Sequence, residues 1–176
     1  HAFGDLARAA VQQLARHSSE AGFAGLVITE AGRTPYLSAA AAALAADLDI
    51  LTGIAVAFPR SPMVTAQVAW ELAEVSDGRF RLGLGTQVRA HIERRYGVDF
   101  DPPGPRMLDY LLAVRDCFAA FRTGELSHHG EFSEEKGRDL TLGKAKHPEA
   151  RHLAPLFGQR DARGVVDDAE GDETAE

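Results

Sequence analysis

The sequence has a single cysteine, no long apolar run and fewer basic than acidic residues, and each shortage excludes a class of protein. With Cys117 alone no intrachain disulfide can form, so a reducing compartment, the cytoplasm, is expected. No segment approaches the roughly 18 consecutive apolar residues of a membrane span. The net charge of −7 disfavours a nucleic-acid partner, because phosphate binding requires a basic face. We therefore expect a soluble cytoplasmic protein that binds neither membranes nor nucleic acids.

The acidic excess is concentrated at the end of the chain. Beyond Arg163 every charged residue is an aspartate or a glutamate. From residue 133 onward the sequence also has many charges, scattered glycine and proline, and only brief apolar islands, which predicts a poorly ordered acidic tail over 133–176. Residues 1–132 are expected to form the folded domain. Because the first residue is His1 and not methionine, we expect the chain to be a piece of a longer protein.

One stretch of the domain has the pattern strand, helix, strand. Residues 50–58 and 80–85 are almost continuously apolar, and residues 62–76 between them have helical spacing with Ser61 as N-cap. Near-continuous apolar strands are typical of a parallel sheet buried on both faces. A helix that joins two parallel strands forms a right-handed crossover. Any ligand site is therefore expected at the C-terminal ends of these strands.

The flanking sequence continues the alternation of helix and strand. The other predicted elements are a helix over 5–21, a strand over 23–29, a helix over 37–46, a charged helical segment over 88–96, a fixed loop over 99–105 and a helix over 106–122. Cys117 lies on the apolar side of the last helix and is expected to be buried. The pattern predicts an α/β protein with about three parallel strands, too few to close a barrel of eight.

Two glycine-bearing segments are candidates for ligand contact. Gly83 and Gly85 begin like a dinucleotide fingerprint, but Val88 occupies the third glycine position, so an open nucleotide-binding domain is disfavoured. These glycines permit either close approach of a ligand or plain packing. Gly53 interrupts the strand at 50–58 and indicates either a bulge that faces a ligand or a kink without one.

Few polar residues have a pattern that carries chemistry. Glu30 lies at the expected C-terminal end of its strand, where a carboxylate can perform acid–base work or bond a cofactor, and Arg33 could neutralise it. His91 follows the strand at 80–85 and could hydrogen-bond a ligand or simply lie on the surface. His128 and His129 have no third ligand at a suitable spacing, so no metal site is expected.

Three segments, taken together, resemble a known family. They are 21–30 (AGFAGLVITE), 52–63 (TGIAVAFPRSPM) and 76–87 (SDGRFRLGLGTQ), and the likeness extends through 91–97 (HIERRYG) to about residue 132. In this order they are similar to the bacterial-luciferase-like monooxygenases, and more narrowly to the branch that uses the deazaflavin coenzyme F-420. The resemblance covers only the N-terminal part of that family.

The resemblance implies a partial TIM (β/α)8 barrel with coenzyme F-420, or alternatively FMN, across the C-terminal strand ends. It implies a non-proline cis peptide at Gly53–Ile54 that backs the coenzyme ring. The implied reaction is hydride transfer, or monooxygenation, on a small organic substrate. The implied site residues are Glu30 as the catalytic group, His91 toward the substrate, and Gly53, Ile54, Ala55, Gly85, Thr86 and Gln87 toward the coenzyme.

The sequence also departs from the family pattern. Arg33 and Thr34 replace a His–Asp pair, no apolar strand precedes the first helix, and the likeness ends after Phe132. We therefore interpret the chain as the N-terminal half of a luciferase-like barrel enzyme. The alternative is a catalytically inactive α/β remnant that acts as a binding or dimerisation module. In either case the unpaired strand edges predict a homo-oligomer.

Overall fold

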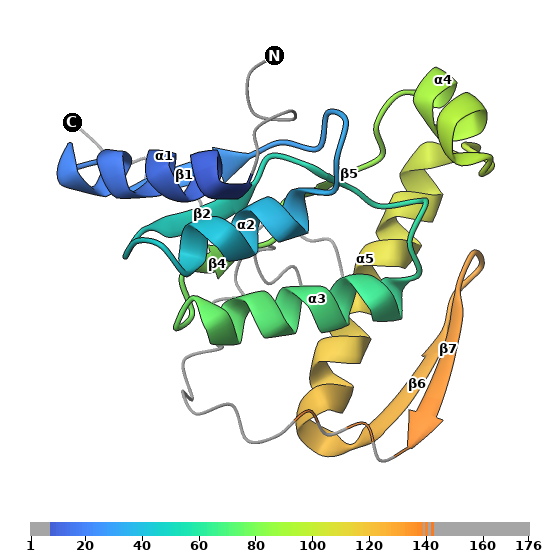
Figure 1. Cartoon of the computed structure of the whole chain (residues 1–176). Helices are drawn as coiled ribbons and strands as arrows, with labels where there is room; N and C mark the ends of the chain where they lie inside the picture. The colour runs from blue at the N-terminus through green and yellow to red at the C-terminus, as the bar shows by residue number, and fades with distance from the viewer. Residues whose placement is uncertain (1–7, 139, 141, 143–176) are drawn as a thin grey trace, which may run out of the picture.

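The computed structural model describes residues 8–138, 140 and 142, and as far as residue 123 helical and strand segments follow one another in the expected order (Figure 1). In chain order the elements are α1 Arg8–Glu20, β1 Gly25–Ile28, α2 Pro35–Ala43, β2 Asp49–Thr52, β3 Ala55–Val56, α3 Pro62–Val75, β4 Phe80–Arg81, β5 Leu84–Gly85, α4 Arg89–His91, the π-helical turn η1 Ile92–Tyr96, α5 Pro103–Thr123, β6 Glu125–His129 and β7 Glu134–Arg138.

Strands β1 to β5 are parallel and follow three paths. β1, β2 and β4 form one sheet in that order, and β3 pairs with β5 beyond it. The predicted strand at 50–58 is thus β2 and β3 with a break at Gly53–Ile54, and the one at 80–85 is β4 and β5 with a break at Gly83. At the second break the Thr52 hydroxyl donates to the Gly83 carbonyl and accepts from its N–H, both at 2.8 Å.

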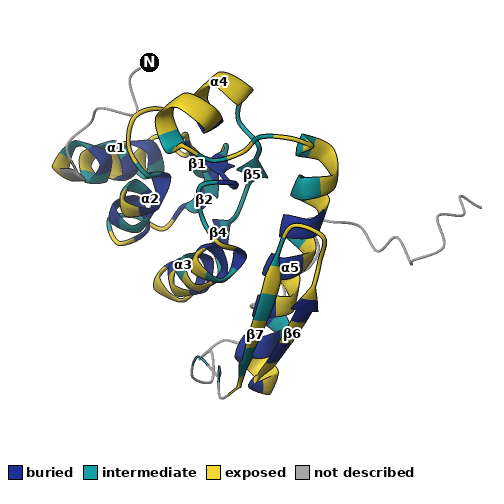
Figure 2. Ribbon diagram, turned by 90° about the vertical axis from the view of Figure 1, so that its right-hand side faces the viewer, coloured by how far each residue is buried: buried dark blue, intermediate teal, exposed yellow. Residues whose placement is uncertain are grey.

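Helices α1, α2 and α3 lie on one side of the strands (Figure 2). Ile50 and Phe80, which are partners in the register of β2 and β4, are 0% and 1% exposed. Side chains alternate between the two faces of a strand, so Val27 of β1 lies on the opposite face, where it is 53% exposed. Among the described residues, the sheet therefore has one face packed under helices and one open face.

Local signals set several helix ends. The Ser61 side chain accepts a hydrogen bond from the Val64 N–H at 3.3 Å, which confirms its prediction as an N-cap. Helix α5 begins at Pro103, so the prediction of a loop through residue 105 is wrong for its last three residues. Proline is tolerated in the first helical turn because the N–H groups there have no partner within the helix.

Cys117 on α5 is 0% exposed, as predicted, and burial raises its pKa to about 12.

The last described elements form an antiparallel hairpin beside α5 (Figure 1). Residues 134–138 were predicted to belong to a poorly ordered tail, and the structure corrects this, since they form strand β7. Its five residues carry charge at four positions and pair with β6, whose inward side chains are Leu126 and His128. The rest of the predicted tail lies outside the described residues, apart from positions 133, 140 and 142. None of the described helices has the length and apolarity to cross a lipid bilayer.

Candidate functional site

The break between β2 and β3 is a bulge with a cis peptide between Gly53 and Ile54, at the position that the resemblance implied. The end of β1 and the residues after it bind the main chain on each side of the cis peptide. The Gly53 N–H donates to the Ile28 carbonyl at 2.8 Å, and the Glu30 N–H donates to the Ile54 carbonyl at 3.3 Å. A Cβ at Gly53 would lie 2.5 Å from Cγ1 of Val27, so any other residue here would require the Val27 side chain to shift.

Parallel pairing of β3 with β5 brings the two glycine-bearing segments together. Ala55 is the register partner of Leu84, and Val56 is the partner of Gly85. A Cβ at Gly85 would lie 3.0 Å from Cδ1 of Ile54, so the side chain of Ile54 covers the backbone of Gly85. The bulge and the end of β5 thus form one continuous wall, which we call the bulge wall (residues 53–55 and 85).

Thr86 and Gln87 continue from this wall into a tight turn. The Thr86 hydroxyl donates to the Gln87 carbonyl at 3.0 Å, and the Gln87 side-chain oxygen accepts from the Val88 N–H at 3.1 Å. Gln87 has a φ of 61°, the left-handed conformation that non-glycine residues rarely adopt. Both side chains are half-buried, which leaves part of their polar surface available to a ligand.

Glu30 is not a free carboxylate, because Arg60 binds it in two places. Nη2 of Arg60 lies 2.6 Å from Oε1 of Glu30, and Nη1 lies 2.9 Å from Oε2. The Val56 N–H also donates to Oε2 at 2.7 Å. The residue that neutralises Glu30 is therefore Arg60 and not Arg33, which is exposed. Burial would lower the pKa of Arg60, but the hydrogen bonds to Glu30 and its charge raise that pKa above the usual arginine value.

His91 is exposed at the end of the short helix α4. The segment that carries it is attached to the strand ends by Arg95 of η1, whose guanidinium donates to the carbonyls of Ala31 and Gly32, both at 3.0 Å. Arg89 holds the same segment through ion pairs with Glu93 and Asp101. The structure thus places His91 on an ordered segment that is attached to the loop after β1.

Sequence reasoning missed Arg60 and the main chain of Val56. Arg60 stands directly after the apolar strand, in Phe58-Pro59-Arg60, and a cation at a strand end beside a predicted carboxylate was the signal that could have paired it with Glu30. The hydrogen bond from the Val56 N–H had no such signal, because every residue except proline has a main-chain N–H and the residue type does not show which one binds a side chain.

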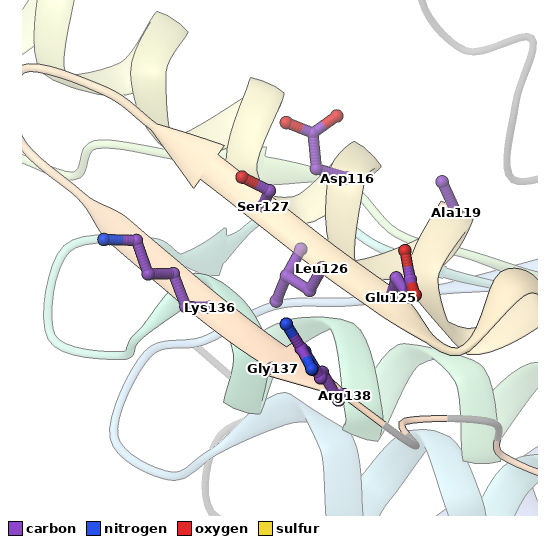
Figure 3. Close-up of a pocket in the computed structure, with 8 residues that line it drawn as sticks. All are labelled: Asp116, Ala119, Glu125, Leu126, Ser127, Lys136, Gly137 and Arg138. Atoms are coloured by element: carbon purple, nitrogen blue, oxygen red, sulfur yellow. The ribbon is translucent and has the colours of Figure 1, made fainter.

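Two cavities lie away from the bulge wall. The larger, of about 790 Å³, is open and lies between the hairpin and α5 (Figure 3). It is lined by Asp116, Ala119, Glu125, Leu126, Ser127, Lys136, Gly137 and Arg138. The second, of about 310 Å³, lies between the loop after β3, the start of α5 and the hairpin. None of the residues predicted for the coenzyme lines either cavity.

Comparison with known proteins assigns the family. The luciferase-like monooxygenase family matches residues 5–156. An uncharacterized protein of Mycobacterium bovis, Mb1395, is 41% identical over 133 residues, which cover 74% of this chain and 38% of that protein. Rv1360 of Mycobacterium tuberculosis, also uncharacterized, has the same identity and coverage. The chain therefore spans well under half the length of these relatives.

Solved structures share the fold at low sequence identity. The F420-dependent tetrahydromethanopterin reductase of Methanopyrus kandleri matches with a TM-score of 0.68 and 19% identity, over 85% of this chain and 46% of that one. The monooxygenase RslO1 of Streptomyces bottropensis gives 0.67 and 20%, over 81% and 45%. The oxygenating constituent of 3,6-diketocamphane monooxygenase of Pseudomonas putida, in complex with FMN, gives 0.63 and 16%, over 78% and 42%.

These matches confirm the predicted fold class, an α/β part of a (β/α)8 barrel with about three parallel strand paths and flanking helices. With the bulge wall in the expected place and the family match over most of its length, the chain belongs to the luciferase-like monooxygenase family.

Proposed function

We propose that this chain is the N-terminal half of a flavin- or deazaflavin-dependent oxidoreductase whose coenzyme ring lies on the bulge wall. The observation that carries the proposal is the parallel pairing of β3 with β5, which places Ile54 against Gly85 at neighbouring strand ends. Ligands of α/β barrels bind at that edge of the sheet.

The bulge wall suits a flat ring. Gly53 and Gly85 contribute backbone without side chains, and Ile54 between them is a half-exposed apolar surface. A planar tricyclic ring gains most from such a surface, because it buries apolar area without displacing side chains. Ala55 is 0% exposed, so it supports the wall from within and would not touch the ring, contrary to its predicted role in coenzyme contact. The polar groups of Thr86 and Gln87 would bond the rim of the ring.

The bound coenzyme would supply the redox chemistry: hydride transfer with coenzyme F-420, or monooxygenation with reduced FMN. The protein's own groups would bind and orient the coenzyme and a small organic substrate. His91 would donate or accept a hydrogen bond to the substrate from its ordered segment. Both coenzymes are candidates, since one structural neighbour is in complex with FMN and another depends on coenzyme F420.

Titration of the purified chain with FMN and with coenzyme F-420, each oxidised and reduced, tests this proposal. We expect saturable binding, followed by coenzyme absorbance and fluorescence. Gly85→Ala should weaken binding by about tenfold, because its methyl group displaces Ile54 from the wall. Gly104→Ala is the matched control, since a Cβ there meets open space and affinity should not change.

An inactive remnant that dimerises is the second candidate. It is favoured by the open sheet face and by Arg33 and Thr34, which stand where the family pattern carries His and Asp. Absence of binding by both coenzymes, together with a stable dimer in gel filtration, would replace the first proposal with this one.

A further inference from the structure

Strand β3 is only two residues long, and within the described part of the chain its main chain has a strand neighbour on one side only. The N–H groups of Ala55 and Ala57 donate to the carbonyls of Gly83 and Gly85, at 2.8 and 3.0 Å. Main-chain groups of successive residues in a strand point to opposite sides. The N–H and C=O of Val56 therefore point away from β5, where β1 has already ended at Ile28.

Two side chains occupy the place of the missing strand. The Val56 N–H donates to Oε2 of Glu30 at 2.7 Å, and Nη1 of Arg60 donates to the Val56 carbonyl at 2.7 Å. The same Nη1 donates to Oε2 of Glu30, so the carboxylate, the guanidinium and the peptide groups of Val56 form one closed network. The Glu30 N–H also donates to the Ile54 carbonyl, and this main-chain hydrogen bond joins the network to the bulge.

The network is largely shielded from solvent. Val56 is 1% exposed, and the side chains of Glu30 and Arg60 are 5% and 18% exposed. The guanidinium carbon of Arg60 lies 5.2 Å from the ring centroid of the buried Tyr36, a cation–π distance that shields the ion pair from water. Without these partners the two polar groups of Val56 would be buried and unsatisfied, which proteins rarely tolerate.

We infer that Glu30 and Arg60 are positioning residues that replace a neighbouring strand for Val56 and thereby hold the bulge wall in the shape that receives the coenzyme. The inference rests on the proposed function for its ligand. It also changes the role predicted for Glu30 from acid–base catalysis to positioning. Three hydrogen bonds hold the two carboxylate oxygens against Arg60 and Val56, and the Glu30 side chain is 5% exposed, so little of it is open to a substrate.

The test combines amide hydrogen exchange at Val56 with coenzyme titration of Glu30→Ala, Glu30→Gln and the control Arg33→Gln. In Glu30→Ala we expect Val56 exchange to accelerate by about a hundredfold and coenzyme affinity to fall by about tenfold. In Glu30→Gln the amide oxygen still accepts hydrogen bonds, so both values should recover most of the way toward wild type. Arg33→Gln should leave both values unchanged.

The outcomes separate the network from the proposed function. Unchanged Val56 exchange in Glu30→Ala would overturn the network. Accelerated exchange with unchanged coenzyme affinity would overturn the positioning role. If the wild type binds neither FMN nor coenzyme F-420, the proposed function fails and the positioning role fails with it, while the exchange data still decide whether the network exists.

Discussion

The main chain at Gly83 runs so close to Thr52 that no side chain fits between them. A Cβ at Gly83 would overlap the carbonyl oxygen of Thr52, while the Thr52 hydroxyl already bonds both polar groups of Gly83. This contact ties β2 to the break between β4 and β5. The glycine is thus explained by close packing of two backbones, one of the two alternatives that its position in the sequence left open.

Gly83→Ala should therefore destabilise the domain. Because backbone atoms cannot move aside as a flexible side chain can, we expect a loss of about 1–3 kcal/mol in the free energy of unfolding. Urea denaturation followed by circular dichroism measures it. Gly104→Ala, in the first turn of α5 and in open space, should be neutral or stabilise by about 0.4–1 kcal/mol. Equal stabilities for the two variants would contradict the packing argument.

At the scale of elements, a buried histidine fastens the hairpin to α5. His128 of β6 is 6% exposed, with Nδ1 2.8 Å from Oδ2 of Asp116 and Nε2 3.3 Å from Oδ1 of Asp109. Asp109 also accepts hydrogen bonds from the Ser133 hydroxyl at 2.7 Å and from the Phe132 N–H at 3.1 Å. A neutral imidazole donates from one nitrogen only, so two carboxylates on its two nitrogens favour the imidazolium form.

The pKa values follow this arrangement. Burial would lower the pKa of His128, but its hydrogen bonds with Asp116 and Asp109 and their charges raise it. Burial would raise the pKa of Asp109, but the hydrogen bonds from Ser133, His128 and the Phe132 amide lower it. Glu135, the register partner of His128 on β7, adds a third carboxylate beside the hairpin's inner face.

We predict that this attachment is strongest in mildly acidic solution. The contribution of His128 is complete below the usual histidine pKa of about 6.5 and is lost as pH rises through its raised pKa. The contribution of Asp109 is present above the usual aspartate pKa of about 3.9 and is lost as pH falls through its lowered pKa. Urea unfolding from pH 5 to 9 should show wild-type stability falling by about 1–2 kcal/mol on the alkaline side.

His128→Asn should be less stable at pH 5 and should show a flatter decline toward pH 9, since the titrating group is gone. His129→Asn is the matched control, because that neighbouring side chain is 60% exposed and on the other side of the strand. A wild-type slope in His128→Asn would show that another group causes the pH dependence.

At the scale of the whole molecule, the described residues form a sheet that is covered on one face only. β1 and β4 are the edges of the three-stranded sheet, and Val27 on the open face is 53% exposed. An open apolar face and unpaired strand edges both favour association with another chain. On these two features we base the prediction of a homo-oligomer.

Gel filtration with light scattering measures the number of chains in solution, and we expect a dimer or larger assembly. Val27→Lys should shift the assembly toward monomer, because it places a charge on the open face. Leu44→Lys serves as the control, since Leu44 is 71% exposed at the end of α2, which lies on the helical side. A monomeric wild type would contradict the prediction.

The hairpin and the Glu30 network mark where prediction from sequence fell short. Residues 134–138 are nearly all charged and show no alternation of apolar and polar side chains, so their sequence does not predict a strand. They form one because they pair with β6. Glu30 was correctly placed at a strand end, but its partner is 30 residues away, and residue types alone do not choose between Arg33 and Arg60.

The sequence by itself determined the order of helices and strands as far as α5, the parallel direction of the strands there and the interruption at Gly53, because apolar periodicity, capping residues and glycines act within a few neighbouring residues. Only the tertiary structure decided that Glu30 bonds Arg60 and Val56, that Gly83 lies against Thr52, and that His128 lies between two carboxylates. Each of these depends on segments far apart in the chain meeting within hydrogen-bond distance, and that depends on how the whole domain packs.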